Sequence, residues 1–200
     1  MPKEKELVFR RNSFSGEQIV PGVYLSSGRI VKVRNIAGKK LFEAQKEPYE
    51  MGIQMSIKVE GHDEPFNLTI DGKFKRSEDG KTIIDKGTAF RVFNVFFNLG
   101  YEGEFRASPT LPQEALDFLV GKEIYRIGYT KGMRQDGSGK QSYGDFNVVY
   151  PMTPEGREKI IAEWHHQRTK GYPKNFVAPG TGGVSAATDP APEVGGREDW

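Results

Sequence analysis

The chain has 200 residues and a formal net charge of +2, with 29 Lys and Arg residues against 27 Asp and Glu residues. It has no cysteine, which excludes a disulfide framework and a thiolate metal site and is typical of a reducing compartment. No apolar run approaches the roughly 20 residues that a membrane-spanning helix needs, so we expect a cytoplasmic protein with no membrane partner.

The first elements along the chain are predicted to be strands. They follow an N-terminal arm over residues 1–20 and begin with a run at 24–36. At 51–59, apolar residues alternate with polar ones, which is the pattern of a strand with one buried face. Residues 66–70 alternate in the same way beyond a Gly- and Pro-containing turn, so the two runs form a hairpin. The aromatic run at 88–105 is almost apolar on both faces and is predicted to be a central strand.

Two helices and a second hairpin follow. Residues 108–122 place a proline near a helix start and a glycine at its end. The runs at 122–131 and 143–152 read as strands joined by a glycine-rich loop. Residues 153–171 begin with the helix-capping residue Thr153 and carry one apolar stripe, so they predict the last helix.

This order predicts a mainly β protein with two short helices. An OB-like Greek-key barrel of five to six strands, with a helix between its third and fourth strands, fits the order over a domain at 21–177 that includes the C-terminal helix. A β-sandwich or another small α+β sheet is the alternative.

Residues 178–200 are predicted to be a disordered acidic tail. Gly, Pro, Ala, Ser and Thr dominate there, and no helical or strand period is present. The tail has four acidic residues against one arginine, so its side-chain charge is −3. Because the whole chain has a net charge of +2, the rest of the chain carries +5. A basic body with an acidic tail is typical of proteins that bind polyanions.

Catalytic and metal-binding patterns are missing from the sequence. The segment 137–142 resembles a phosphate-binding loop but has Arg134 where that loop needs glycine and Gln141 where it needs Ser or Thr. His165 and His166 are adjacent on a predicted helix, so their side chains diverge by about 100° and cannot share a metal ion. We therefore expect no catalytic residues, no metal, no cofactor and no enzyme activity.

Basic residues interleaved with aromatic ones instead predict a surface for single-stranded nucleic acid. Unpaired bases stack on aromatic rings, while Lys and Arg contact the phosphates. The candidate residues are Arg29, Lys32, Arg34, Lys73, Phe74, Lys75, Arg76, Arg91, Phe93, Tyr129, Lys131, Arg134, Lys140 and Tyr143. Phe74, Tyr129 and Tyr143 lie near turns and are predicted to be exposed. The aromatic residues expected in the core are Phe66, Phe90, Phe96, Phe146 and Tyr150.

The chain ends in EVGGREDW, with Glu198 and Asp199 before Trp200. A basic, aromatic body with a Gly- and Pro-rich linker and an acidic tip that ends in an aromatic residue resembles bacterial and phage single-stranded DNA-binding proteins. The tip departs from that family in ending with Trp rather than Phe and in carrying Arg197 beside the acids.

That resemblance implies largely sequence-independent binding that protects single-stranded DNA in replication and recombination. For a phage protein the compartment is the host cytoplasm. RNA is a possible ligand too, and the oligomeric state is open. The resemblance also implies that Glu198, Asp199 and Trp200 dock on replication or recombination proteins. Two alternatives stand beside it: a structural β protein of a virion that binds no nucleic acid, and a metal-dependent hydrolase built from distant carboxylates.

Overall fold

The computed structural model describes residues 17–20, 23–133 and 141–171. The predicted arm at 1–20 lies mostly outside these residues, and the predicted tail at 178–200 lies wholly outside them. The elements are β1 (Glu17–Val20), β2 (Val23–Asn35), β3 (Met51–Lys58), β4 (Phe66–Gly72), β5 (Lys75–Arg76), β6 (Ile83–Asp85), α1 (Phe90–Asn98), α2 (Gln113–Leu119), β7 (Glu123–Met133), β8 (Gln141–Asp145), β9 (Tyr150–Pro151) and α3 (Pro154–Thr169).

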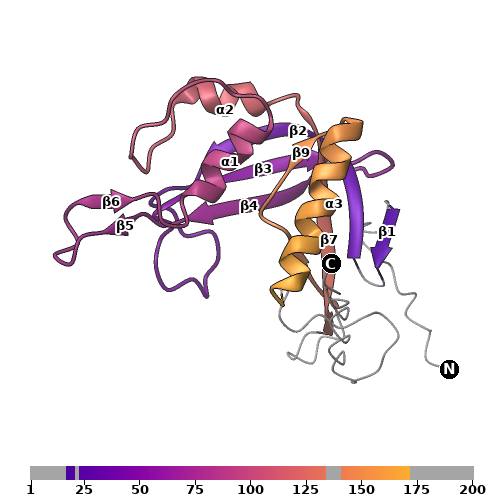
Figure 1. The fold of residues 1–200 in the computed structure, drawn as a ribbon, viewed down its shortest axis with the longest axis horizontal. Helices are drawn as coiled ribbons and strands as arrows, with labels where there is room; N and C mark the ends of the chain where they lie inside the picture. The colour runs from indigo at the N-terminus through magenta and orange to yellow at the C-terminus, as the bar shows by residue number, and fades with distance from the viewer. Residues whose placement is uncertain (1–16, 21–22, 134–140, 172–200) are drawn as a thin grey trace, which may run out of the picture.

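Seven strands form one antiparallel sheet in which β4, β3, β2, β7 and β8 are hydrogen-bonded in that order (Figure 1). β1 pairs with β2, β9 pairs with β7, and β5 and β6 form a separate small hairpin. The prediction of a mainly β protein is confirmed, as are the strands predicted at 24–36, 51–59, 66–70 and 122–131. The strand predicted at 143–152 is divided into β8 and β9.

The sheet curls but does not close into the predicted barrel, because β4 and β8, the two ends of its strand order, are not paired with each other among the described strands. β2 produces the curl, since it pairs with β7 over its first half and with β3 over its second half. Its register with β3 shifts between Ile30 and Lys32, and a bulge of this kind increases strand twist. At the bend, a Cβ on Gly28 would lie 2.7 Å from Ile57 Cγ2 and 2.7 Å from the Lys58 carbonyl oxygen. A side chain there would push β2 and β3 apart.

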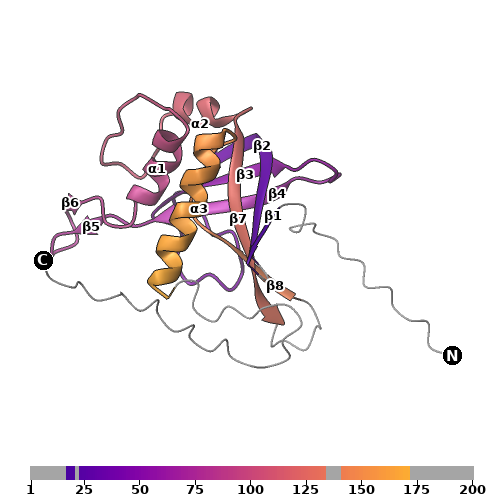
Figure 2. The same cartoon turned by 45° about the vertical axis from the view of Figure 1, so that its right-hand side comes forward.

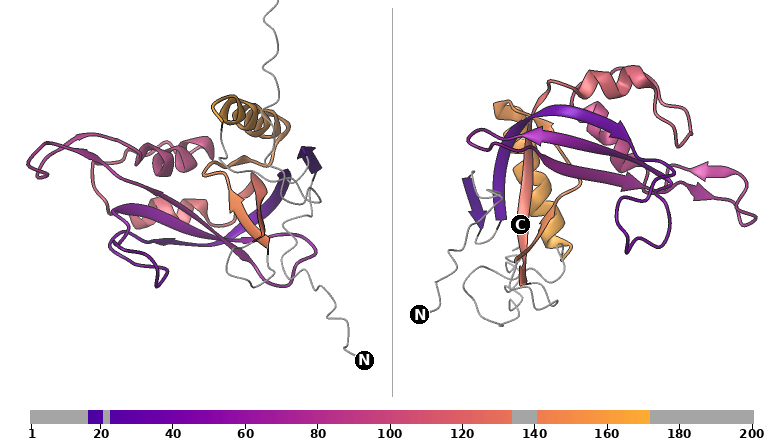
Figure 3. Two further views of the ribbon diagram at one scale, coloured as in Figure 1. Left: turned by 90° about the horizontal axis from the view of Figure 1, so that it is seen from below. Right: turned by 180° about the vertical axis from the view of Figure 1, so that it is seen from behind.

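The larger hydrophobic core fills the concave face of the sheet, beneath α1 and α2 (Figures 1 and 3). The alternate residues of β3 that enter it are fully buried. They are Met51, Ile53, Met55 and Ile57. This is the face that the alternation at 51–59 predicts to be buried.

The prediction of a central strand at 88–105 is wrong, because this run contains helix α1. The buried residues of α1 are Val92, Phe93, Val95 and Phe96. Their spacing is that of one helical stripe, and the stripe packs on the core. Phe90 and Phe97 fill the outer side of the helix, with 44% and 48% of their surfaces exposed, and so hide the period in the sequence. Phe90, predicted to be in the core, is therefore exposed instead.

A second, smaller core lies between the sheet and α3 (Figure 2). Val23 and Leu25 of β2 enter it, whereas Ile30 of the same strand enters the larger core. An odd separation along a strand reverses the face, so α3 packs on the convex side of the sheet. The predicted capping by Thr153 is confirmed, since its hydroxyl oxygen accepts a hydrogen bond of 3.1 Å from Gly156 N.

Replacing Gly156 with alanine is expected to destabilise the protein, although alanine is the better helix former. A Cβ at this position would lie 2.0 Å from the Pro151 carbonyl oxygen, which belongs to the backbone of β9 and cannot turn aside. Helix propensity alone would stabilise by about 1 kcal/mol, whereas we expect a net loss of about 1–3 kcal/mol from overpacking. Urea unfolding measures the sign. Glu158→Ala on an exposed position of the same helix is the control, and a Gly156→Ala variant more stable than the native protein would contradict the prediction.

Candidate nucleic-acid interface

The convex side of β2, β3 and β4 presents a row of polar side chains that no described helix covers. Because alternate residues of β3 enter the core, Gln54, Ser56 and Lys58 point away from α1 and α2. Antiparallel pairing places residues of β2 and β4 beside them on the same side. We call this set the open face: Arg29, Lys32, Arg34, Gln54, Ser56, Lys58, Asn67 and Thr69.

Hydrogen bonds hold the polar groups of the open face in place across three strands. Arg34 Nε donates to Gln54 Oε1 at 2.8 Å, and Gln54 Nε2 donates to Thr69 Oγ1 at 3.2 Å. Ser56 Oγ donates to Asn67 Oδ1 at 2.7 Å. These contacts fix the Arg34 side chain through Nε and leave its two terminal amino groups without a hydrogen-bond partner among the described residues, so they are available to a ligand.

The open face carries four cations, against one carboxylate on the same side of these strands, Asp71 near the end of β4. Arg29 forms an exposed ion pair with Glu123 at 2.7 Å, and Lys58 Nζ donates to the Asp63 carbonyl oxygen at 2.9 Å. Lys32 and Arg34 form no ion pair with a described carboxylate. A line of cations with neighbouring amides and hydroxyls suits a chain of phosphates.

The segment 36–50, which joins β2 to β3, lies on the side of the sheet opposite α1 and α2 and so borders the open face (Figures 1 and 3). An open cavity of about 350 Å³ lies where residues 45–50 meet residues 71–73. Burial, and then the nearby charge of Asp71, raise the pKa of Tyr49 at its wall. The Tyr49 hydroxyl therefore stays protonated and can donate a hydrogen bond near neutral pH.

Three predicted basic residues, Arg29, Lys32 and Arg34, come together on the open face. Lys73, Lys75 and Arg76 lie elsewhere, at or next to the β5–β6 hairpin. There Lys73 is 3.7 Å from Glu47 and Arg76 is 2.8 Å from Glu50. Arg91 is exposed on α1, on the opposite side of the sheet. Among the described residues, the structure thus divides the predicted basic set into three groups.

The prediction that Phe74 and Tyr129 are exposed is wrong. Phe74, Phe93 and Tyr129 are each only 6% exposed. Phe74 packs against Phe93 beneath α1, and Tyr129 packs against Phe146 beneath α3. The sequence neighbours of Phe74 and Tyr129 are polar or glycine, but tertiary packing turns both rings inward, so these rings have no surface on which a base could stack.

Some predicted residues lie outside the described part of the chain. The backbones of Lys131 and Tyr143 belong to β7 and β8, but their side chains are outside it. Arg134 and Lys140 lie outside it entirely, and so do the predicted partner-binding residues Glu198, Asp199 and Trp200. These predictions stay untested.

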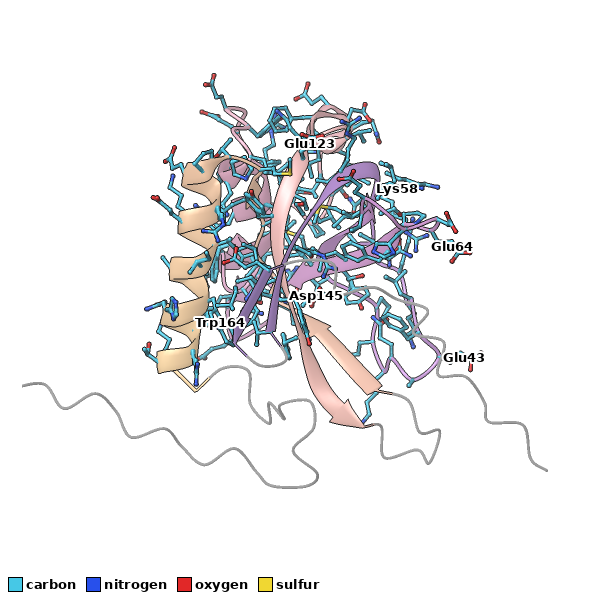
Figure 4. All side chains as sticks on the ribbon, turned by 90° about the vertical axis from the view of Figure 1, so that its right-hand side faces the viewer. Glu43, Lys58, Glu64, Glu123, Asp145 and Trp164 are labelled. Carbon is cyan, nitrogen blue, oxygen red and sulfur yellow. The ribbon has the colours of Figure 1, made fainter. Side chains whose placement is uncertain are left out.

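Five of the eight residues of the open face were not predicted from the sequence. They are Gln54, Ser56, Lys58, Asn67 and Thr69. The alternation at 51–59 held the signal, since the polar residues between its buried positions must share one exposed face. Figure 4 shows Lys58 on the side of the molecule away from α3.

No model of a known protein family matches the chain, and no curated protein matches it either. In the described part, no helix is long and apolar enough to cross a membrane, and no three His, Asp or Glu side chains gather as a metal site.

Proposed function

We propose that this protein binds single-stranded nucleic acid across the open face, without strong sequence preference. The observation that carries the proposal is an uncovered sheet face with four cations, Arg29, Lys32, Arg34 and Lys58, set among hydrogen-bonding side chains. Cations at this spacing neutralise phosphates and release counterions, and the amides and hydroxyls can bond sugars or bases. The ligand is DNA in the first instance, and RNA presents the same phosphates.

The element order supports the proposal through the fold. The meander β2–β3–β4, the helices, and the return of β7 beside β2 follow the order of an OB fold that lacks the pairing between its last and third strands. OB folds bind oligonucleotides on the face of the second and third strands and with the neighbouring loops. In this chain β3 and β4 hold those two places, and segment 36–50 is the loop between the first and second strands.

In the cell, such binding would protect single strands during replication or recombination. The acidic tip with Glu198, Asp199 and Trp200 would then recruit other proteins, since carboxylates steer toward a basic rim and an indole fills an apolar pocket. This role extends the proposal beyond the described residues.

A fluorescence titration with oligo(dT) at several salt concentrations tests the proposed function. We expect binding whose logarithm falls linearly with the logarithm of the salt concentration, with a slope of about −3 if all four cations contact phosphates. Duplex DNA of equal length should bind more weakly, because its stacked bases and stiff backbone fit a single open sheet face less well. Absence of oligo(dT) binding at about 50 mM salt would overturn the proposal and favour a structural protein.

A further inference from the structure

Phe42, in segment 36–50, is the most exposed large apolar side chain of the described residues, with 61% of its surface accessible. A single exposed apolar residue is ordinary on a protein surface. Phe42 differs because the backbone that carries it is fixed.

Gln45 braces the turn beneath Phe42. The Gln45 side-chain oxygen Oε1 accepts a hydrogen bond of 3.0 Å from Leu41 N, and its Nε2 donates to the Glu47 carbonyl oxygen at 2.7 Å. Gln45 N also donates to the Phe42 carbonyl oxygen at 3.1 Å. The turn is thus closed on both sides of Phe42, and the ring is held outward by a folded backbone.

The base of segment 36–50 is closed as well. Gly38 N donates to the Tyr49 carbonyl oxygen at 2.8 Å, and Tyr49 N donates to the Lys39 carbonyl oxygen at 3.0 Å. Ala37 N donates to Asn35 Oδ1 at 2.8 Å. A loop whose ends meet and whose interior is bonded to itself is a compact surface loop, a kind that often carries function. The folding of this loop leaves its largest apolar group in water.

In segment 36–50, which carries Phe42, three lysines without an ion pair to a described carboxylate outnumber the one carboxylate without an ion pair, and this excess favours an anionic ligand. Of the three carboxylates of the segment, Glu47 pairs with Lys73 and Glu50 pairs with Arg76, whereas Glu43, beside Phe42, is exposed and forms no ion pair with a described cation. The three exposed lysines of the segment form no ion pair with a described carboxylate. They are Lys39, Lys40 and Lys46. Figure 4 shows Glu43, the neighbour of Phe42, on the same side of the molecule as Lys58 of the open face.

The open face itself lacks an aromatic side chain among its eight described residues. It can bond phosphates, sugars and base edges, but it offers no aromatic ring on which a base can stack. Because Phe42 supplies the exposed ring that the open face lacks, we propose that Phe42 is the stacking platform of the interface, on which one base of the bound strand lies. Lys39, Lys40 and the open face hold the phosphates on either side of that base. This inference rests on the proposed function and adds the contact that distinguishes a nucleic acid from other polyanions.

The experiment compares Phe42→Ala with the native protein on two ligands, oligo(dT) and an abasic deoxyribose-phosphate oligomer of the same length. Stacking of one base predicts a loss of affinity for oligo(dT) of about 5- to 150-fold. The salt slope should not change, because an uncharged ring releases no counterions. Affinity for the abasic oligomer should be the same for both proteins. Phe42→Trp should retain the affinity, and its added fluorescence should be quenched by oligo(dT) and not by the abasic oligomer.

Phe90→Ala is the matched control, since it removes an exposed phenylalanine from α1 on the far side of the sheet. It should bind both ligands as the native protein does. If the native protein binds oligo(dT) and Phe42→Ala binds it equally well, the stacking role is wrong while the proposed function stands. Equal losses on both ligands would also overturn stacking and assign Phe42 to the shape of the loop. No binding by the native protein would instead reject the proposed function itself.

Discussion

Replacing Asp145 with alanine is expected to lower the free energy of unfolding by about 3 kcal/mol, the low end of the range for breaking a buried ion pair. The loss arises at Arg126, which is 4% exposed and pairs with Asp145. Burial lowers the pKa of Arg126, and the Asp145 carboxylate acts in the opposite direction. A guanidinium does not release its proton near neutral pH, so without Asp145 the charge stays buried and poorly compensated.

Arg126 also explains how an open sheet keeps its curl. Its guanidinium lies over the Phe66 ring, 3.7 Å from the ring centroid, although β7 and β4 are separated by β2 and β3 in the sheet. The contact therefore spans the concave face near the edges that strand pairing leaves open. Arg126 Nε and Ser26 Oγ, directly across on β2, are buried without a hydrogen-bond partner among the described residues. Burying these two groups without partners lowers the free energy of unfolding, and the hydrogen bond from Arg126 to Asp145 offsets part of that loss.

Arg126→Met should be milder than Asp145→Ala, with a loss of about 1 kcal/mol, because methionine can still pack on Phe66 and the remaining carboxylate is 28% exposed and can be hydrated. The double variant should recover most of the Asp145→Ala loss. Glu123→Ala, which breaks the exposed pair with Arg29, is the control and should change stability by less than about 1 kcal/mol. Urea unfolding of all four variants gives the comparison. A milder effect for Asp145→Ala than for Arg126→Met would contradict this account.

The sequence predicts much of this fold, because alternation and helix capping are local signals. The half-buried strand at 51–59, its hairpin with 66–70 and the Thr153 cap are all found in the structure. The curl of β2 is different, because it depends on a bulge near Ile30 and on which half of the strand meets which neighbour. Neither is visible in the composition of the strand.

The error at α1 has a physical cause. Its residues have high strand propensity, so a local reading favours a central strand. The helix is chosen by tertiary packing, since one stripe of it covers the concave core while Phe90 and Phe97 remain outside. The same limit applies to the aromatic site predictions. Phe74 and Tyr129 have polar or glycine neighbours in sequence, but the direction of each ring follows from tertiary packing, against Phe93 for Phe74 and against Phe146 for Tyr129.

The sequence predicted only part of the candidate site for the same reason. Arg29, Lys32 and Arg34 stand in one strand, where sequence spacing can suggest a shared surface. Lys58 and the amides of β3 and β4 join them only through strand register, which pairs Arg29 with Lys58 and Arg34 with Gln54. Register is set by long-range pairing and the bulge in β2, so a single sequence does not reveal it.

Replacing Lys32, Arg34 and Lys58 together with glutamine is expected to reduce the affinity for oligo(dT) by about 100-fold at 0.1 M salt. Three phosphate contacts on a single strand give a slope of about −2 when the logarithm of the binding constant is plotted against the logarithm of the salt concentration. The electrostatic contribution vanishes toward about 1 M salt, so between about 0.1 M and 1 M it amounts to about two powers of ten in affinity. Glutamine removes the charge but keeps hydrogen-bonding capacity at each position. The slope of the variant should therefore fall by about two units, while its unfolding by urea stays near that of the native protein.

The matched control replaces Lys86, Arg91 and Arg106 with glutamine. These cations are exposed beside α1 and in the connection from α1 to α2, on the other side of the sheet. Both triple variants have the same net charge. If binding depended only on the net charge of the protein, the two variants would lose the same affinity for oligo(dT). Contact at the open face instead predicts a change of slope in the first variant alone, because only ions displaced at the point of contact enter the slope. Equal losses, with equal slopes, would mean that the strand does not lie on β2, β3 and β4.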